Sequence, residues 1–119
     1  MHELSVCQGM LGQVATIVRE HQAESVSRIT IRIGPLSGVE PRLLKEAFSI
    51  ARAGSVAAEA ELVIEELSVR VHCTKCGADS NASPNRLLCA ECGDWKTQVI
   101  GGDELLLASV ELNKETSDV

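Results

Sequence analysis

Four cysteines are the residues in this sequence whose types and spacing point most directly to chemistry. They form two C-x-x-C pairs separated by twelve residues: Cys73, Cys76, Cys89 and Cys92. Such pairs can hold one Zn2+ in a closed tetrahedron of thiolates, at Zn–S distances of about 2.3 Å. A glycine follows each pair, at Gly77 and Gly93, where the chain must turn tightly and glycine readily adopts positive φ. The spacing therefore predicts a structural zinc site that folds the segment around it.

The charge balance argues against a general nucleic-acid-binding protein. The 119 residues include 11 basic and 17 acidic side chains, giving a net charge of -6, whereas phosphate binding needs a basic face. The segment around the cysteines is nearly neutral, because four thiolates with one Zn2+ carry a charge of about -2 that offsets its small basic excess. We therefore expect no nucleic-acid partner.

Cysteine usage and hydropathy indicate a soluble chain in a reducing compartment. Paired cysteines in the cytosol more often bind metal than form disulfides. The fifth cysteine, Cys7, lies in a helical apolar pattern, where it is expected to be a small buried residue. Polar residues interrupt every N-terminal apolar run, so no signal peptide is predicted. No run of about 20 apolar residues is present to span a bilayer. The expected location is the cytoplasm.

Two helices are predicted from apolar periodicity. Between residues 4 and 21 apolar side chains recur every three or four positions: Leu4, Cys7, Leu11, Val14 and Val18. Gly9 and Gly12 each cost about 1 kcal/mol relative to alanine inside a helix, which indicates close packing against a neighbour. A second helix is expected to begin at Pro41 and to end near Gly54. Its buried side is expected to hold Leu44, Ala47, Phe48 and Ala51.

Three strands complete the predicted fold. Residues 27–33 and 106–112 alternate apolar and polar side chains, as half-buried strands do. Residues 61–71 are interpreted as one strand whose buried parity changes partway, so a β-bulge is expected near Glu65 and Glu66. The predicted fold class is α+β. It comprises a two-layer domain of two helices on a three-stranded mixed sheet, with an inserted four-cysteine zinc-ribbon module.

The order of these elements predicts an interrupted domain. Residues 1–70 plus 102–115 are expected to form one discontinuous α/β domain. Residues 71–101 are expected to form the zinc-binding module, inserted between the last two strands. Residues 116–119 are polar and are expected to form a flexible tail.

The first three residues, Met1, His2 and Glu3, offer a second set of metal donors. Because methionine removal normally requires a small second residue, we expect Met1 to be retained. Its α-amine and the amide nitrogen and imidazole of His2 can then chelate one ion together, and Glu3 either adds its amide nitrogen or leaves a fourth position open. Such a planar set of nitrogen donors suits Ni(II) or Cu(II). By chemistry alone the signal is weak, since a histidine at position two is usually an ordinary surface residue.

Several motifs in combination make the chain resemble a known family. Met1-His2-Glu3-Leu-Ser opens the sequence, and Ile33-Gly-Pro-Leu-Ser-Gly-Val-Glu40 follows. The two cysteine pairs come next, and Gly102-Asp-Glu-Leu leads into the last predicted strand. Together these motifs look like the HypA/HybF family of hydrogenase maturation nickel metallochaperones, and the resemblance covers nearly the whole chain.

The resemblance implies a nickel carrier, not an enzyme. The discontinuous α/β domain would bind Ni2+ as cargo through Met1, His2 and Glu3, with Glu40 as an accessory residue. The four cysteines would hold structural Zn2+. The protein would deliver nickel to the [NiFe]-hydrogenase large subunit together with the GTPase of the same pathway, and urease maturation factors are further partners to consider. From its position alone, Glu40 is equally well explained as an acidic residue at a helix start.

Three other functions remain open from the residues. The runner-up is a zinc-ribbon protein-interaction or nucleic-acid-binding module without a mobile metal. A thiol redox protein fits less well, because duplicated pairs that each precede a glycine favour a metal site. An enzyme is disfavoured because no nucleophile–base pair or phosphate loop is readable.

His72, beside Cys73, is expected to be an ordinary strand-end residue, and tuning of the zinc site is the alternative hypothesis.

Overall fold

The computed structural model describes residues 2–114, which form two helices and six strands in two sheets. The elements are α1 (His2–Glu20), β1 (Ser25–Ile33), α2 (Pro41–Ala51), β2 (Glu61–Glu66), β3 (Val69–Cys73), β4 (Asp79–Ala82), β5 (Thr97–Gly101) and β6 (Leu105–Asn113). One sheet has the strand order β2-β1-β6, and the other has the order β4-β3-β5. The predicted fold class, with its helices, mixed sheet and four-cysteine module, is confirmed.

Packing divides the chain into two compact units. The first comprises Met1–Ile31, Val39–Ile64 and Leu107–Val119, and the second comprises Arg32–Gly38 and Glu65–Leu106. The second unit is thus larger than the segment 71–101 that we expect to form the zinc-binding module. The domain boundaries expected from the sequence stay a prediction, and the tail at 116–119 lies outside the described residues. Within residues 2–114, no helix combines the length and the apolar character needed to cross a membrane.

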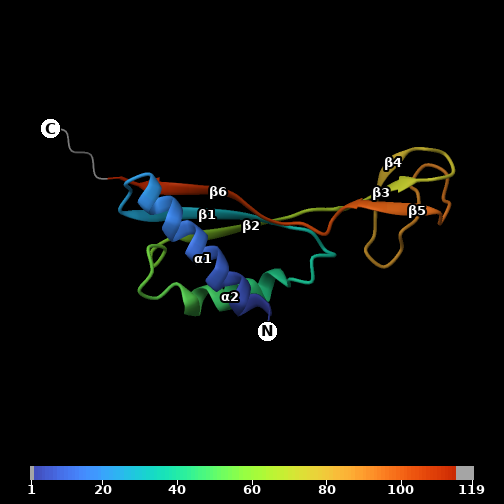
Figure 1. Ribbon diagram of the computed structural model, residues 1–119. Coiled ribbons are helices and arrows are strands. Elements are labelled where there is room, and N and C mark those ends of the chain that lie inside the picture. The colour runs from blue at the N-terminus through green and yellow to red at the C-terminus, as the bar shows by residue number, and fades with distance from the viewer. Residues whose placement is uncertain (1, 115–119) are drawn as a thin grey trace. The chain divides into compact units, whose positions relative to one another are not determined.

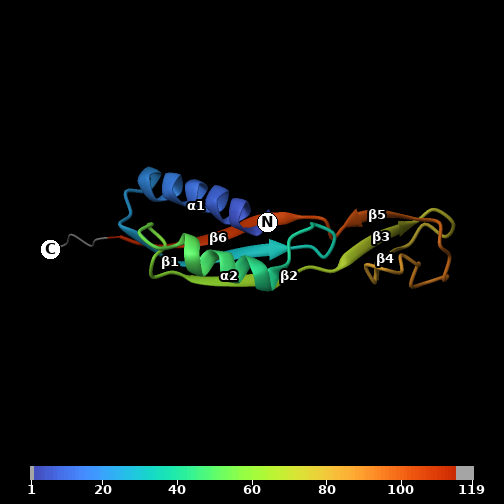
Figure 2. The same cartoon turned by 90° about the horizontal axis from the view of Figure 1, so that it is seen from below.

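Helices α1 and α2 lie side by side on one face of the sheet β2-β1-β6, most of whose residues belong to the first unit (Figure 1 and Figure 2). The central strand β1 buries its alternate residues Ile29, Ile31 and Ile33. Two ion pairs, Arg28–Glu61 and Arg32–Glu65, join β1 to β2. Because the residue numbers rise together from the first pair to the second, the two strands run parallel. Strand β6 runs antiparallel to β1, because Glu24 N–H donates to Asn113 and Gly34 N–H donates to Glu104.

The first helix follows the predicted stripe except at its start and at its glycines. Its core face comprises Cys7, Met10, Leu11, Val14 and Val18. Leu4 is 43% exposed, so its inclusion in the buried stripe was wrong. The expected close packing at Gly9 and Gly12 was also wrong, since a Cβ at either position would meet nothing within 4 Å. After Glu20 the helix ends in a Schellman motif: Gln22 adopts a φ of 56°, and Ala23 N–H donates to the Val18 carbonyl.

The second helix begins where Pro41 predicts. Glu40 is its N-cap residue, and the Glu40 carboxylate accepts a hydrogen bond from Arg42 N–H at 3.2 Å. Leu44 and Phe48 are buried, as expected from their spacing, whereas Ala47 and Ala51 are only half-buried, so their inclusion in the buried side was wrong. At the C-terminal end the Arg52 guanidinium lies 4.8 Å from the centre of the Phe48 ring and donates to carbonyls in the following loop. The guanidinium thereby ties this loop to the helix end.

The single bulged strand expected at residues 61–71 is wrong. The chain instead forms two strands that belong to different sheets, β2 up to Glu66 and β3 from Val69 onward. Between them, Leu67 N–H donates to the Ile33 carbonyl at 2.8 Å. The change of buried parity therefore marks the passage from one sheet to another, where the side of the strand that faces a core changes.

A second three-stranded sheet, which the sequence analysis did not foresee, organises the cysteine module. Strand β3 is central and pairs antiparallel with both β4 and β5. Its alternate residues Val69, Val71 and Cys73 are buried. Cys73 thus ends a buried strand, which fixes where the first cysteine pair begins.

Candidate metal centre

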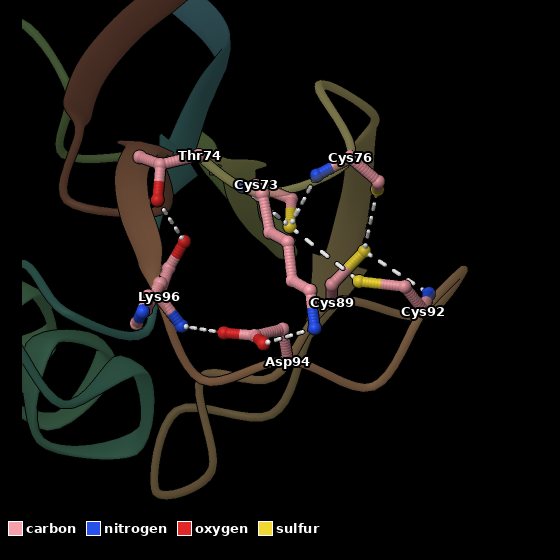
Figure 3. Close-up of polar contacts among 8 residues, drawn as sticks. Cys73, Thr74, Cys76, Cys89, Cys92, Asp94 and Lys96 are labelled. Carbon is pink, nitrogen blue, oxygen red and sulfur yellow. Dashed lines mark hydrogen bonds and ion pairs between the residues drawn. The ribbon is translucent and has the colours of Figure 1, made fainter.

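The four predicted zinc ligands meet at one point in the second unit. All four Sγ atoms lie within 4.8 Å of one another. The Cys73–Cys92 and Cys76–Cys89 Sγ–Sγ distances are both 3.6 Å (Figure 3). A tetrahedral ion bound at about 2.3 Å from each sulfur requires sulfurs about 3.8 Å apart. The thiol arrangement therefore fits a closed tetrahedral site.

Each C-x-x-C pair builds the same hairpin around its first sulfur. The Sγ atoms of Cys73 and Cys89 each accept two backbone N–H groups, at 3.3 to 3.4 Å. The donors are Lys75 and Cys76 in the first hairpin and Glu91 and Cys92 in the second. Gly77 and Gly93 close the two turns with N–H bonds to the Cys73 and Cys89 carbonyls, both at a φ of 79°. Both glycines therefore have the positive φ that the sequence predicted.

Because of these contacts, the four thiols have different pKa values. The N–H of Cys92, with that of Glu91, lowers the pKa of Cys89 to about 6 against the opposing effect of burial. The pKa of Cys73 is lowered in the same way by the N–H groups of Cys76 and Lys75. For Cys92, the Asp94 N–H lowers the pKa, but desolvation and the neighbouring sulfurs outweigh it and raise the pKa to about 12. A cation at the centre is needed for four thiolates to coexist, because like charges at this distance repel.

Residues that the sequence analysis missed hold the two hairpins together. Asp94 accepts the Lys96 N–H at 2.8 Å (Figure 3). The other oxygen of Asp94 lies 3.4 Å from Lys75 Nζ in the opposite hairpin. Thr74 donates to the Lys96 carbonyl through both its N–H and its hydroxyl. Ser80, on β4, is buried and accepts the Ala90 N–H at 3.1 Å. Only the paired strands bring these residues together, so no spacing rule could have found them.

His72 does not belong to the ligand set. Among the side chains that the structure describes, the only group of at least three His, Cys, Asp or Glu residues able to share an ion is the four cysteines. The His72 ring places Nδ1 2.7 Å from Asp79 Oδ1, across the β3–β4 pair. Its position at a strand end agrees with the ordinary role expected for it.

The structure brings two of the four predicted nickel residues together. Met1 lies outside the described residues, and of His2 only the backbone is described, as the first residue of α1. Glu3 is 8% exposed, and its Oε2 accepts the backbone N–H of Glu40 at 3.1 Å. This hydrogen bond is the largest cause of a lowered pKa for the Glu3 carboxyl.

The contact between Glu3 and Glu40 completes a capping box across two helices. In an ordinary capping box, an acidic side chain in the helix's own third position accepts the N-cap N–H. That position in α2 is Leu43, which has no acceptor. Glu3 supplies the missing carboxylate from α1, while the Glu40 carboxylate caps Arg42. The start of α1 is thereby fastened to the start of α2.

A helix-covered mixed sheet together with a four-thiolate centre defines this chain as a small α+β metal-binding protein. The family model HypA, described as hydrogenase/urease nickel incorporation metallochaperone, matches residues 1–112. The chain belongs to the HypA family. The match includes Met1, His2, Glu3 and all four clustered cysteines, so the resemblance drawn from the motifs is confirmed.

Named relatives and solved structures agree with this assignment. The hydrogenase maturation factor HypA of Aquifex aeolicus is 41% identical over 112 residues, which cover 94% of this chain and 97% of that protein. The HypA of Nitrosospira multiformis is 43% identical with the same coverage. A solution structure of the nickel metallochaperone HypA from Helicobacter pylori matches with a TM-score of 0.68 and 25% identity, covering 95% of this chain and 98% of the other. The family is thus named for metal incorporation and not for a catalysed reaction.

Proposed function

We propose that this protein carries Ni2+ on its N-terminal segment and delivers it during hydrogenase maturation. The observation that carries the proposal is the continuous family match from residue 1 to residue 112, which includes the Met-His-Glu start. Relatives that are 41% and 43% identical are named hydrogenase maturation factors, which supports the same role here. The delivery target is the [NiFe]-hydrogenase large subunit, and a GTPase of the pathway is the partner. The cytoplasm is the proposed location.

The proposed nickel donors are nitrogen atoms at the start of the chain. The α-amine of Met1 and the amide and imidazole nitrogens of His2 supply three of them, and the fourth position is taken by the amide nitrogen of Glu3 or left open. Planar nitrogen sets suit Ni(II). The backbone of His2 opens α1, so no earlier turn of the helix offers a carbonyl to its N–H. This position supports the proposal, because a hydrogen bond inside a helix would hold the proton on the amide nitrogen that is proposed to bind nickel.

Glu40 serves in this proposal as an accessory group and not as a principal ligand. Its carboxylate is exposed and caps α2, and its own N–H is held by Glu3. An exposed carboxylate fastened beside the N-terminal segment can attract a cation without enclosing it. Loose coordination suits a carrier, which must release its cargo to the next protein.

The four-cysteine centre has the opposite character and is proposed to keep structural Zn2+. All four positions of the tetrahedron are filled by protein sulfurs, so no open position is left for exchange. Binding of the ion would contribute directly to folding of the module around β3. The shaped module then provides surface for a partner in the maturation pathway, and urease maturation factors are included because the family description names urease.

Metal stoichiometry tests the proposal. Nickel and zinc are measured by elemental analysis and calorimetric titration in the untagged protein, in His2→Ala and in a chain extended before Met1. We expect both changes to abolish nickel binding and to leave zinc at one per chain. The control is His21→Ala, an exposed histidine just after the same helix, which should bind nickel normally. Nickel binding that survives a blocked α-amine would refute the N-terminal site, and zinc without any nickel binding would favour the interaction-module alternative.

A further inference from the structure

Strand β5 is an open edge of the sheet that organises the cysteine module. The strand order β4-β3-β5 leaves β5 with a strand partner on one side only among the described residues, and the ribbon views show it along the border of that sheet (Figure 1 and Figure 2). Thr74 N–H donates to the Lys96 carbonyl, and His72 pairs with Gln98 two positions further along. Because bonded and non-bonded pairs alternate in an antiparallel ladder, Val99 directs its N–H and C=O away from β3. These groups are available to a further strand.

The side chains along this edge are apolar and exposed. Trp95, the only tryptophan of the chain, is 72% exposed, and Val99 and Ile100 are 42% and 53% exposed. Val99 lies opposite the buried Val71, so its side chain is on the face of the sheet that holds the core of the module. Large apolar side chains gathered on an open edge mark an interaction site.

A lysine lies on the other face of the same edge. Side chains alternate between the two faces of a strand, so Lys96 and Gln98 lie opposite in direction to Val99. The Lys96 ammonium lies 5.8 Å from the centre of the Trp95 ring, and within residues 2–114 it makes no ion pair. Its positive charge is therefore available to a carboxylate.

The neighbouring strands add a second positive charge to this face. Arg70 of β3 donates to the neutral Asn81 side chain at 2.8 Å, so its charge is not compensated there. The acidic residue of the same face, Asp79, is on β4, the far edge, and contacts His72 at 2.7 Å. The face is therefore basic toward the β5 edge and apolar on its reverse side.

The edges of the other sheet have the opposite charge. Strand β2 carries three glutamates among six residues, Glu61, Glu65 and Glu66. Strand β6 carries Glu111 and no basic residue. Both edges therefore repel an acidic segment, whereas β5 attracts one.

From these observations we infer that β5 binds, as a fourth strand, an extended segment of a partner protein in which acidic and apolar residues alternate. Its apolar side chains would lie beside Val99 and its carboxylates on the face of Lys96. Backbone hydrogen bonds to Val99 would supply affinity, as in other cases of strand addition. The bulge at Ile100, where the register with β3 shifts, would keep the added strand short. The inference extends the proposal that the zinc-loaded module provides a partner surface, and it uses none of the proposed nickel donors.

Two synthetic peptides of about ten residues test the charge and the edge together. One alternates Glu and Val, and the other alternates Lys and Val. Each is titrated into the zinc-loaded wild type, with the fluorescence of Trp95 and NMR shifts of backbone amides as readouts. We expect the acidic peptide to bind about tenfold more tightly than the basic one and to bind more weakly at high salt. The amide of Val99 should shift, and the amides of β2 and β6 should not.

Three substitutions test the residues of the edge. Lys96→Glu should weaken binding of the acidic peptide about fivefold or more and make the basic peptide the preferred one. Val99→Pro removes an N–H that is directed away from β3, so it should abolish binding without loss of a bond within the sheet. Trp95→Ala, followed with a labelled peptide, should weaken binding about fivefold or more.

Controls separate these effects from misfolding and from the nickel site. Ile50→Ala, on α2, removes an apolar side chain that is also 72% exposed and should leave peptide binding unchanged. Each variant should retain one zinc per chain. His2→Ala should bind the acidic peptide normally, so either proposal can fail without the other. Equal binding of the two peptides, or binding of neither at millimolar concentration, would overturn the inference. Protection of the Val99 amide by self-association would also overturn it and would assign the edge to a second copy.

Discussion

Glu3 lies in the first turn of α1, and its carboxylate holds the N-cap residue of α2, 37 positions along the chain. At the scale of single residues this contact changes the role expected for Glu3. The amide nitrogen of Glu3 is the proposed nickel donor, whereas the carboxylate positions the segment. Cys7 is a second buried titratable group of α1, and its Sγ lies 3.6 Å from the Leu44 carbonyl on α2. Both residues therefore fasten α1 to α2.

Removal of the Glu3 carboxylate should loosen the start of α2. In Glu3→Ala the N–H of Glu40 loses its acceptor, so we expect a lower melting temperature and faster hydrogen exchange at Glu40. Glu3→Gln keeps an acceptor oxygen and should retain most of the stability. The matched control is Glu20→Ala, at the exposed end of the same helix. Equal effects of Glu3→Ala and Glu20→Ala would contradict the cross-helix cap.

Cys7 should behave as an inert thiol in the folded protein. Burial raises the pKa of Cys7 above its usual value of 9.0, so the thiolate fraction near pH 8 is smaller than in the unfolded chain. The stability gained from the buried neutral thiol is present below the unfolded pKa and is lost as pH rises through the higher folded pKa. We expect maleimide labelling of Cys7 in the zinc-loaded protein only after denaturant is added, as measured by mass spectrometry. Rapid labelling of the folded protein would show that α1 opens locally.

At the scale of elements, close approach of the backbone restricts two positions to glycine. A Cβ on Gly34, just after β1, would lie 2.1 Å from the Gly102 carbonyl oxygen. Gly102 itself has a φ of 109°, and Leu36 N–H donates to its carbonyl at 2.7 Å. This crossing, in the second unit, admits only glycine. The glycines of α1 differ, because they face open space.

Substitutions at these glycines should therefore have opposite signs. Gly34→Ala forces backbone apart and should lower the free energy of unfolding by about 1–3 kcal/mol or more. Gly12→Ala meets nothing within 4 Å and removes the conformational entropy cost of glycine in a helix, so it should raise that free energy by about 1 kcal/mol. Urea denaturation of both variants and the wild type measures the difference. Destabilisation by Gly12→Ala would indicate that this face of α1 packs against something.

At the scale of the whole molecule, two separate cores have different sources of stability. The first unit buries apolar side chains of both helices against β1. The second unit has few buried apolar side chains around β3, and its four thiols converge on one point. Small cores of this kind usually need a metal to fold. We therefore expect the second unit to unfold when the metal is removed, while the first unit stays folded.

Chelation of the metal should unfold the module and spare the helices. With a strong zinc chelator, or in Cys76→Ser, we expect amide signals from residues 71–101 to lose dispersion in NMR spectra. The amides of α1 and α2 should remain protected from exchange. Readdition of Zn2+ to the chelated wild type should restore the module, whereas Cys76→Ser should not recover fully. Simultaneous loss of both sets of signals would contradict independent cores.

The local features of this protein were readable in the sequence. The cysteine spacing, the positive φ of Gly77 and Gly93, the start of α2 at Pro41 and the alternation in β1 all depend on residues a few positions apart. Local spacing is set by covalent geometry and by helix or strand periodicity, so a sequence displays it directly. The family resemblance extended this reading to nickel, which spacing alone indicated only weakly.

Tertiary structure decided the features that depend on distant partners. The parity change at residues 65–67 was compatible with a bulge or with a change of sheet, and only the strand order settled it. The cross-helix cap joins Glu3 to a residue 37 positions away, and Asp94 meets Lys75 only because the two hairpins face each other. The free edge of β5 follows from which strand lies at the border of its sheet. A sequence records which residues are apolar or charged, but the choice among possible neighbours is made by packing the whole chain.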